Sequence, residues 1–278
     1  GQLPQGEISD EQLLALFKGL DARVVDLDEA RLDSAYDAYT FDARKAAIDP
    51  ELSVAIPPEQ DRATLGRRSR YQTVYLVWKD GAVDRVILPI NGAGMWSMLY
   101  GYLALEADFN TIAGTIFYEQ NETPGLGDQI TDRNWQAKWQ GKQIFDHTGE
   151  LLFHVAEGPV TAGSAAAAYQ VDALTGATVT GNAVTRVVQY WLGPHGYGPL
   201  LAQLRENPPA QPAAVLFDTT EPAMPLLPAQ LLLMAPPKDD PCVVLREIVE
   251  VWMLMVPAEL LLTAPPKPPA TLSVTRRL

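Results

Sequence analysis

Threonines and small residues gather in one short segment, which reads DALTGATVTGN from Asp172 to Asn182. Gly176 and Ala177 precede Thr178 close to the start of a predicted helix, so we expect the Thr178 hydroxyl to be exposed. The first backbone N–H groups of a helix have no partner within it, and its N-terminus is the positive end of the helix dipole. Both properties favour a bound anion, above all a phosphate. By themselves, such residues more often form only a turn and a helix cap.

Hydrophobic periodicity predicts three helices. The first follows Ser9, which forms a capping box with Gln12. The second covers residues 180–192, and the glycine- and proline-rich block 193–198 ends it. The third begins at Pro199 and runs to about residue 205. The apolar side of the second helix consists of Ala183, Val184, Val187, Val188 and Trp191.

β-branched and aromatic residues predict strands over 71–79 and 83–90, and the Asp80-Gly81 pair between them predicts a hairpin turn. Residues 110–118 and 151–155 are predicted as two further strands. Strands and helices follow one another without a regular alternation. The sequence therefore indicates an α+β fold, with packed helices on a mixed or antiparallel sheet.

Glycine and proline divide the chain of 278 residues into two parts. All 20 glycines lie at or before residue 198, whereas 14 of the 23 prolines lie at or after residue 208. We therefore expect a single domain over residues 1–205 and an irregular tail rich in proline and leucine over residues 206–278. No run of 18 uncharged apolar residues occurs, so no membrane-spanning helix is expected.

Composition excludes several classes of partner and site. The formal net charge of −13 argues against binding to nucleic acids, whose phosphates attract Lys and Arg. The single cysteine excludes a disulfide framework or a cysteine-based metal site within the chain, and the three histidines fit no local metal motif. Asp26, Asp28, Glu29 and Asp33 are interpreted as a solvated acidic face, and Trp135 and Trp139 as core residues.

The segment from Asp172 to Thr178 resembles the flavinylation motif of the FMN-binding domain family, Asp-x-x-(Ser/Thr)-Gly-Ala-Thr, at every position. Further segments are similar to one branch of that family, the C subunits of Na+-translocating NADH:quinone oxidoreductases. These segments cover residues 89–97, 100–106, 110–114, 118–127, 139–142 and 191–199. The resemblance covers about residues 9–205, and the tail has no counterpart in the family.

The resemblance implies that FMN is bound covalently, through a phosphoester to Thr178. The segment around that threonine contributes Thr175, Gly176, Ala177, Val179 and Thr180 to the cofactor site, with Thr175 and Thr180 as possible donors to the phosphate. Two other segments contribute Trp96, Glu122, Thr123, Gly125 and Leu126. Trp96 and Leu126 would be the apolar walls for the flavin ring, although the residues themselves are equally consistent with two ordinary core side chains.

The resemblance also implies an activity and a location. The subunit relays electrons in a membrane complex that oxidises NADH, reduces ubiquinone and exports Na+, and it needs no catalytic residue or metal of its own. A separate Mg²⁺-dependent flavin transferase attaches the cofactor from FAD. The family members have a single N-terminal transmembrane helix, which is missing here, and their soluble domain faces the periplasm of the bacterial inner membrane.

Three alternatives stay open. The G subunit of the Rnf complex, which passes electrons between ferredoxin and NAD, shares the Glu-Thr-Pro-Gly-Leu-Gly and Gly-Ala-Thr motifs. A free-standing extracytosolic flavin carrier would bind FMN without belonging to a complex. A purely structural domain is disfavoured unless Thr178 is buried away from any cleft.

The boundary near residue 205 is testable. We predict that a protease cleaves residues 206–278 before residues 1–205, because 14 prolines prevent long helices and central strands in the tail. Limited proteolysis followed by mass spectrometry should yield a stable fragment that ends near Arg205. Equal resistance of the two parts would contradict the division.

Overall fold

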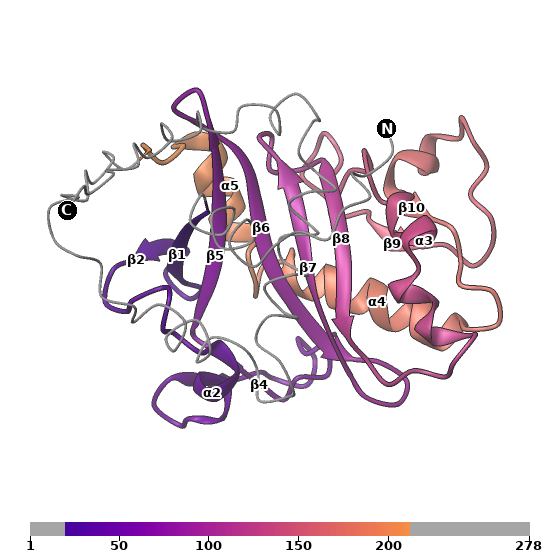
Figure 1. The fold of residues 1–278 in the computed structure, drawn as a ribbon, viewed down its shortest axis with the longest axis horizontal. Helices are drawn as coiled ribbons and strands as arrows, with labels where there is room; N and C mark the ends of the chain where they lie inside the picture. The colour runs from indigo at the N-terminus through magenta and orange to yellow at the C-terminus, as the bar shows by residue number, and fades with distance from the viewer. Residues whose placement is uncertain (1–19, 212–278) are drawn as a thin grey trace, which may run out of the picture.

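The computed structural model describes residues 20–211 of the chain (Figure 1). The helix predicted after Ser9 and the tail from residue 212 onward lie outside the described residues. None of the described helices is long and apolar enough to cross a lipid bilayer.

A six-stranded antiparallel sheet is the main element of the fold, with the strand order β2-β1-β5-β6-β7-β8. Its strands are β1 (Asp21–Asp26), β2 (Arg31–Asp33), β5 (Tyr71–Lys79), β6 (Ala82–Ala93), β7 (Met98–Glu106) and β8 (Ile112–Glu119). The predicted strand over 71–79 and the hairpin after it are confirmed. Asp80 and Gly81 have φ values of 52° and 83°, as the two central residues of a type I′ turn require.

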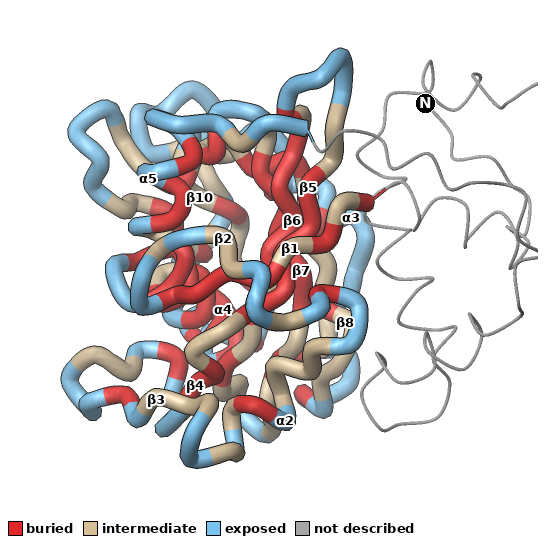
Figure 2. The backbone as a smooth tube through the Cα atoms, turned by 90° about the vertical axis from the view of Figure 1, so that its left-hand side faces the viewer, coloured by how far each residue is buried: buried red, intermediate tan, exposed pale blue. Residues whose placement is uncertain are grey.

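Two helices, α4 (Thr178–Trp191) and α5 (Gly198–Glu206), lie on one face of the sheet (Figure 1). The apolar side predicted for the first of them is confirmed, since all five of its residues are at most 1% exposed. These helices share a large core with Leu76, Leu88 and Leu103 of the sheet. Figure 2 shows that the buried residues are concentrated in the central strands and along α4, whereas the peripheral loops are exposed. A second, smaller core on the other face contains Tyr75, Ile87 and Tyr102.

The remaining elements are short and flank the sheet. On one side lie α2 (Ala43–Ile48), β3 (Ser53–Ala55) and β4 (Arg67–Ser69). The segment after β8 contains the 3-10 helix η1 (Gly127–Thr131), α3 (Arg133–Ala137), β9 (His154–Val155), the 3-10 helix η2 (Ala165–Tyr169) and β10 (Gln170–Val171). Trp135 and Trp139 belong to the core, as expected, with exposed fractions of 6% and 0%.

The sheet is divided between β5 and β6. The two strands pair only from Tyr75, opposite Ile87, to the hairpin turn, so the first residues of β5 have no partner on β6. Side chains at and after the end of α4 bond carbonyls of β6 in this region. Trp191 Nε1 donates to the Asn91 carbonyl at 2.7 Å, and Tyr197 Oη donates to the Pro89 carbonyl at 2.9 Å. This division opens a space within the sheet.

Several predicted element bounds differ from the structure. The strand predicted over 110–118 begins only at Ile112, because the Asn110 side chain bonds the backbone of Phe145 through both its oxygen and its nitrogen. Of the strand predicted over 151–155, only residues 154–155 form β9, and Leu151 makes an isolated bridge to Phe145. The helix predicted to begin at Thr180 begins two residues earlier.

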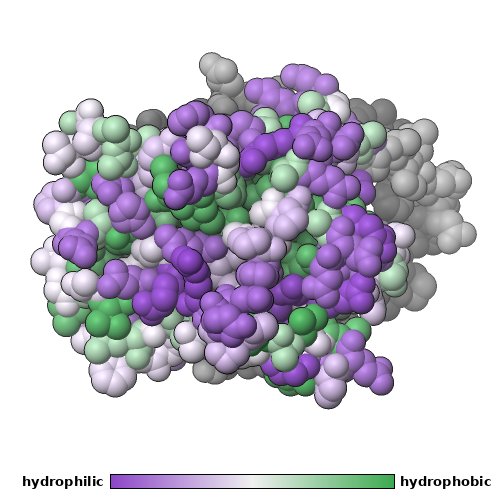
Figure 3. Space-filling view, turned by 180° about the vertical axis from the view of Figure 1, so that it is seen from behind, coloured by the Kyte–Doolittle hydropathy of each residue, from purple (hydrophilic) through white to green (hydrophobic). Residues whose placement is uncertain are grey.

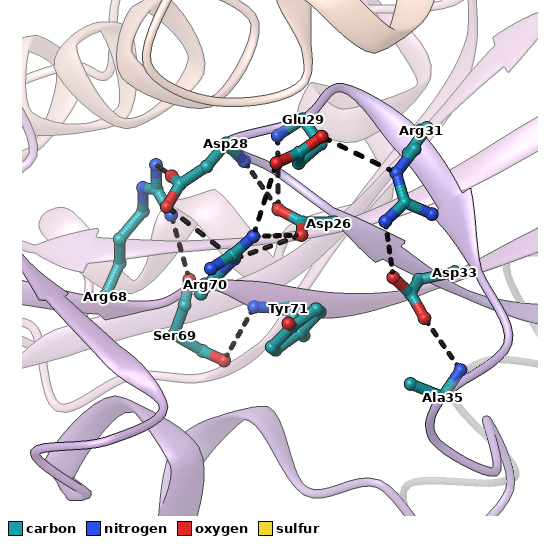
Figure 4. A network of polar contacts seen from close by, with 10 residues as sticks. All are labelled: Asp26, Asp28, Glu29, Arg31, Asp33, Ala35, Arg68, Ser69, Arg70 and Tyr71. Carbon is teal, nitrogen blue, oxygen red and sulfur yellow. Dashed lines mark hydrogen bonds and ion pairs between the residues drawn. The ribbon is translucent and has the colours of Figure 1, made fainter.

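The interpretation of the acidic run as a solvated face is wrong for Asp26, which is only 1% exposed (Figure 4). Arg70 Nη2 and Nε donate to Asp26 Oδ2 at 2.7 and 3.0 Å. The backbone N–H groups of Asp28 and Glu29 donate to Asp26 Oδ1 at 3.0 and 3.2 Å. The pairing of β1 with β5 places Asp26 opposite Tyr71 and so beside Arg70, a contact between residues far apart in the sequence.

Asp26 should make stability depend on pH. Burial by itself raises the pKa of Asp26, but the bonds from Arg70 and the two backbone N–H groups more than offset this and lower it. Because the pKa is lower in the folded state, the ionised group stabilises the fold above its unfolded pKa of about 3.9 and stops doing so as the pH falls through the folded value.

We therefore expect Asp26→Asn to lower the free energy of unfolding by about 1–3 kcal/mol at pH 7, because Arg70 loses its charged acceptor. The difference in the free energy of unfolding between Asp26→Asn and the wild type should shrink when urea unfolding is repeated below pH 3.5. The matched control is Glu29→Gln, whose exposed side chain should contribute less than about 0.5 kcal/mol. A difference that stays constant with pH would contradict this account.

Candidate functional site

Thr178 is the first residue of α4, and its side chain is exposed. Ala177 stands at the cap position, where its side chain makes no capping hydrogen bond. The chain enters the helix through Gly176, which has a φ of 75° and is therefore in the left-handed region that glycine adopts readily. The first-turn N–H groups therefore have no side-chain cap from Ala177, and they lie beside an accessible hydroxyl. This arrangement suits a bound phosphate.

Large apolar side chains are exposed close to this helix end. We define the apolar patch as Met95, Trp96, Leu126 and Val179, which are 50%, 66%, 40% and 51% exposed. They come from three segments: the connection between β6 and β7, the turn before η1, and the first turn of α4. Exposed apolar side chains that gather in one place indicate a ligand or partner surface.

Direct contacts join two of these segments, the turn before η1 and the start of α4. A Cβ atom placed on Gly176 would lie 2.9 Å from Leu126 Cδ2, so the turn before α4 packs against that side chain. The Gln129 side-chain amide donates to the Gly125 carbonyl at 2.9 Å and to the Thr175 carbonyl at 3.5 Å. The patch is therefore continuous with the start of the helix.

Beneath the apolar patch, the carboxylate of Glu122 links the connection between β6 and β7 to the first turn of α4. It is only 4% exposed, and its Oε1 accepts the backbone N–H groups of Met95 and Trp96, both at 3.0 Å. Its Oε2 accepts the Thr180 hydroxyl at 2.5 Å. Gly94 and Gly127 leave room for this arrangement, because a Cβ atom on either would lie 2.5 to 2.6 Å from Glu122 Oε1 or Thr180 Oγ1.

These bonds correct the expected role of Thr180. Its side chain is 1% exposed and its hydroxyl is already bonded to Glu122, so it does not offer a donor to a phosphate at the surface. Glu122 likewise lies beneath the patch and supports it. Thr175, by contrast, is exposed beside Thr178.

Trp96 is a surface residue, so the core alternative for this side chain is excluded. Its Nε1 donates to Thr123 Oγ1 at 3.0 Å, which fixes the plane of the indole while its ring stays accessible. Gly125 has a φ of 74° within the turn that carries Leu126. The tight turn expected at this place and the expected exposure of the Thr178 hydroxyl are both confirmed.

Asp172, the first residue of the motif, fixes the segment that leads to Thr178. Its Oδ1 accepts the Val160 N–H, and its Oδ2 accepts Lys138 Nζ, both at 2.7 Å. The Lys138 ammonium, together with the Val160 N–H, holds the pKa of Asp172 below its ordinary value. The Asp172 carbonyl also accepts the indole N–H of Trp135. The carboxylate is therefore occupied in structural bonds.

Sequence reasoning missed Met95 as a member of the patch. The signal was available, since Met95 stands between Gly94 and Trp96 at the end of a glycine-rich stretch. It also missed the link between Glu122 and Thr180, which are 58 residues apart. No local spacing could have indicated that contact.

Comparisons with known proteins agree with this geometry. A family model described as FMN-binding domain matches residues 94–193, a range that contains Thr178 and the whole apolar patch. A crystal structure of Shewanella oneidensis NqrC is 38% identical in sequence, with a TM-score of 0.66, over 74% of this chain and 90% of that one. A crystal structure of the corresponding reductase protein from Parabacteroides distasonis is 28% identical, with a TM-score of 0.52, over 70% and 85% of the two chains.

The C subunit of the Na(+)-translocating NADH-quinone reductase of Pseudomonas aeruginosa is 46% identical to this chain over 201 residues. The match covers 72% of this chain and 77% of the relative. The described sheet and helices thus have the fold of solved members, and the expected α+β class is confirmed. The chain belongs to the NqrC family, the C subunits of the Na(+)-translocating NADH-quinone reductases.

Proposed function

We propose that this chain is the FMN-carrying electron-transfer subunit of a Na+-translocating NADH:quinone reductase, with FMN bound through a phosphoester to Thr178 Oγ1. One observation carries the proposal. The exposed Thr178 hydroxyl stands in the first turn of α4, beside the apolar patch, at the end of a complete Asp172–Thr178 motif. The FMN-binding domain model and the named relatives support the same cofactor and complex.

The two ends of FMN match two different parts of the site. The phosphate would lie at the first-turn N–H groups of α4, where the helix dipole favours negative charge. The flat flavin ring would lie against Trp96 and Leu126, the exposed members of the patch that flank the Glu-Thr-Pro-Gly turn. When bound, FMN supplies reversible electron uptake, which no side chain here provides.

The protein residues position and tune the cofactor. The Thr123 hydroxyl orients the Trp96 indole, and Gly125 permits a close approach of the turn backbone to the ring edge. Glu122 keeps the Trp96 loop and α4 in a fixed relation beneath the ring. A phosphoester leaves the flavin ring chemically unmodified, so these surroundings set its properties.

Attachment requires a second protein in this proposal. Thr178 Oγ1 forms a bond to the phosphorus of the FMN half of FAD, the pyrophosphate bond breaks, AMP leaves, and the hydroxyl proton passes to a base of the second protein. The nearby carboxylates Asp172 and Glu122 are occupied in hydrogen bonds, so neither is free to take that proton. We therefore assign this step to a flavin transferase.

The proposed reductase complex implies the other partners of this chain and its cellular location. We propose that this chain contacts membrane subunits of the reductase, and that its FMN-binding domain lies on the periplasmic side of a bacterial inner membrane. The names of the relatives support a role in the reductase. The periplasmic side of the membrane is proposed because the sequence resembles the C subunits of these reductases.

The attachment residue is tested by co-expression with a flavin transferase. The wild type should stay yellow after denaturation and gain the mass of one FMN less one water, as measured by mass spectrometry. Thr178→Ala should lose both properties, while the exposed position keeps the change in unfolding free energy below about 0.5 kcal/mol. The matched variant Thr175→Ala should retain covalent flavin at lower yield. Covalent flavin in Thr178→Ala would disprove the assignment.

Support from Glu122 is tested separately. Glu122→Ala leaves two backbone N–H groups and the Thr180 hydroxyl without their acceptor. We therefore expect the free energy of unfolding, measured by urea denaturation, to be about 2–4 kcal/mol lower than that of the wild type. The visible circular dichroism of the attached flavin should weaken, because the Trp96 loop is no longer fixed. Glu157→Ala, at an exposed position, is the control. Wild-type stability and spectrum in Glu122→Ala would refute this role.

A further inference from the structure

A cavity of about 600 Å³ lies where β5 and β6 separate. Gln72 and Tyr75 of β5 line one side, and Pro89 and Asn91 of β6 line the other. Short elements at its edge, α2 and β4, contribute further lining residues. None of the four residues of the apolar patch lines this cavity, so it is separate from the proposed flavin site. Its volume is in the range of small-molecule sites.

The cavity is basic although the protein is acidic. Its charged lining residues are Arg44, Arg67, Arg68 and a single aspartate, Asp42, whereas the whole chain has a net charge of −13. Figure 3 shows how widely hydrophilic side chains cover the face seen from behind. Arg44 is paired with Glu119 and Arg68 with Asp28, whereas Arg67 makes no ion pair within residues 20–211. The lining therefore keeps a positive charge, which favours a negatively charged ligand over a cationic one.

Arg44 is held in place and keeps donors for a ligand. Its guanidinium carbon lies 3.5 Å from the centre of the Tyr100 ring, and Nη1 donates to Glu119 Oε2 at 2.9 Å. Nη2 donates to the Tyr118 hydroxyl at 3.1 Å. The Nε–H group is not used in these bonds, and a guanidinium has five N–H donors. Arg44 is therefore positioned to bind an anion without leaving Glu119.

The Gln72 side chain supplies a second donor. It is only 7% exposed, and within residues 20–211 its amide makes no hydrogen bond. The Gln72 amide is not among the fully buried unpartnered atoms of the described residues, so it is accessible from the cavity and available to a ligand there. Aromatic rings complete the lining, namely those of Phe41, Tyr75, Tyr100, Tyr102 and Tyr118. Tyr102 and Tyr118 are stacked, with ring centres 5.3 Å apart.

We propose that this cavity binds a small planar aromatic carboxylate. The ligand ring would lie among the tyrosine rings, and its carboxylate would accept from the Arg44 guanidinium and the Gln72 amide. The aromatic lining selects for the flat ring, and the excess of arginine selects for the anion. The proposal assigns a second ligand site to this chain, independent of the one at α4.

The probe is 2-naphthoate, titrated into the protein of 278 residues by isothermal titration calorimetry. The neutral analogue 2-naphthalenemethanol and the cationic 2-naphthylmethylamine are titrated in parallel. We expect saturable binding of the naphthoate and at least tenfold weaker binding of both analogues. Gln72→Leu and Arg44→Gln should each weaken naphthoate binding about tenfold, as expected for the loss of one charge-assisted hydrogen bond. Arg31→Gln, an exposed arginine outside the cavity, is the matched control and should bind as the wild type.

Folding of each variant is checked by its circular dichroism and its urea midpoint. If Arg44→Gln unfolds, Gln72→Leu carries the test, because leucine is similar in size and the lost amide has no partner in the described fold. The proposal is overturned if the wild type shows no saturable binding of naphthoate. It is also overturned if the three probes bind equally, or if folded Gln72→Leu binds naphthoate as tightly as the wild type.

Discussion

The buried carboxylate of Glu122 is the interaction on which the candidate site depends. It accepts two backbone N–H groups from the connection after β6 and one hydroxyl from the first turn of α4. Each of these groups would otherwise be a polar atom beneath an apolar surface, where a missing partner is costly. One side chain thus fixes the distance between the wall of the patch and the helix end. The phosphate and ring positions proposed for FMN both follow from that distance.

The sheet and helices supply the rigid frame for this interaction. Helix α4 packs closely on β6 at Gly92, where a Cβ atom would lie 2.5 Å from Val187 Cγ2. The same helix ends at Trp191, whose indole bonds the Asn91 carbonyl where β6 has separated from β5. The division between β5 and β6 is therefore stabilised by side chains, and the cavity forms part of the fold. The two sites use opposite ends of α4, since Val179 of the patch is in its first turn and Trp191 of the cavity lining is its last residue.

Electrostatics differs between the parts of the molecule. Asp26 shows that an acidic residue in this protein can be buried when an arginine and two backbone N–H groups satisfy it. The apolar patch has no charged member, which suits a neutral ring, and the cavity between β5 and β6 has an excess of arginine. A chain of negative net charge with an excess of arginine in one cavity thus offers chemically distinct surfaces.

The sequence by itself determined the features that depend on neighbouring residues. Periodicity located the buried side of α4, the Asp-Gly pair located the hairpin, and the motif ending at Thr178 located the helix start to within two residues. Only the tertiary structure decided which side chains meet. Glu122 and Thr180, Asp26 and Arg70, and Trp191 and Asn91 are each separated by at least 44 residues. Such contacts follow from strand pairing and helix packing, which bring together groups that no local spacing relates.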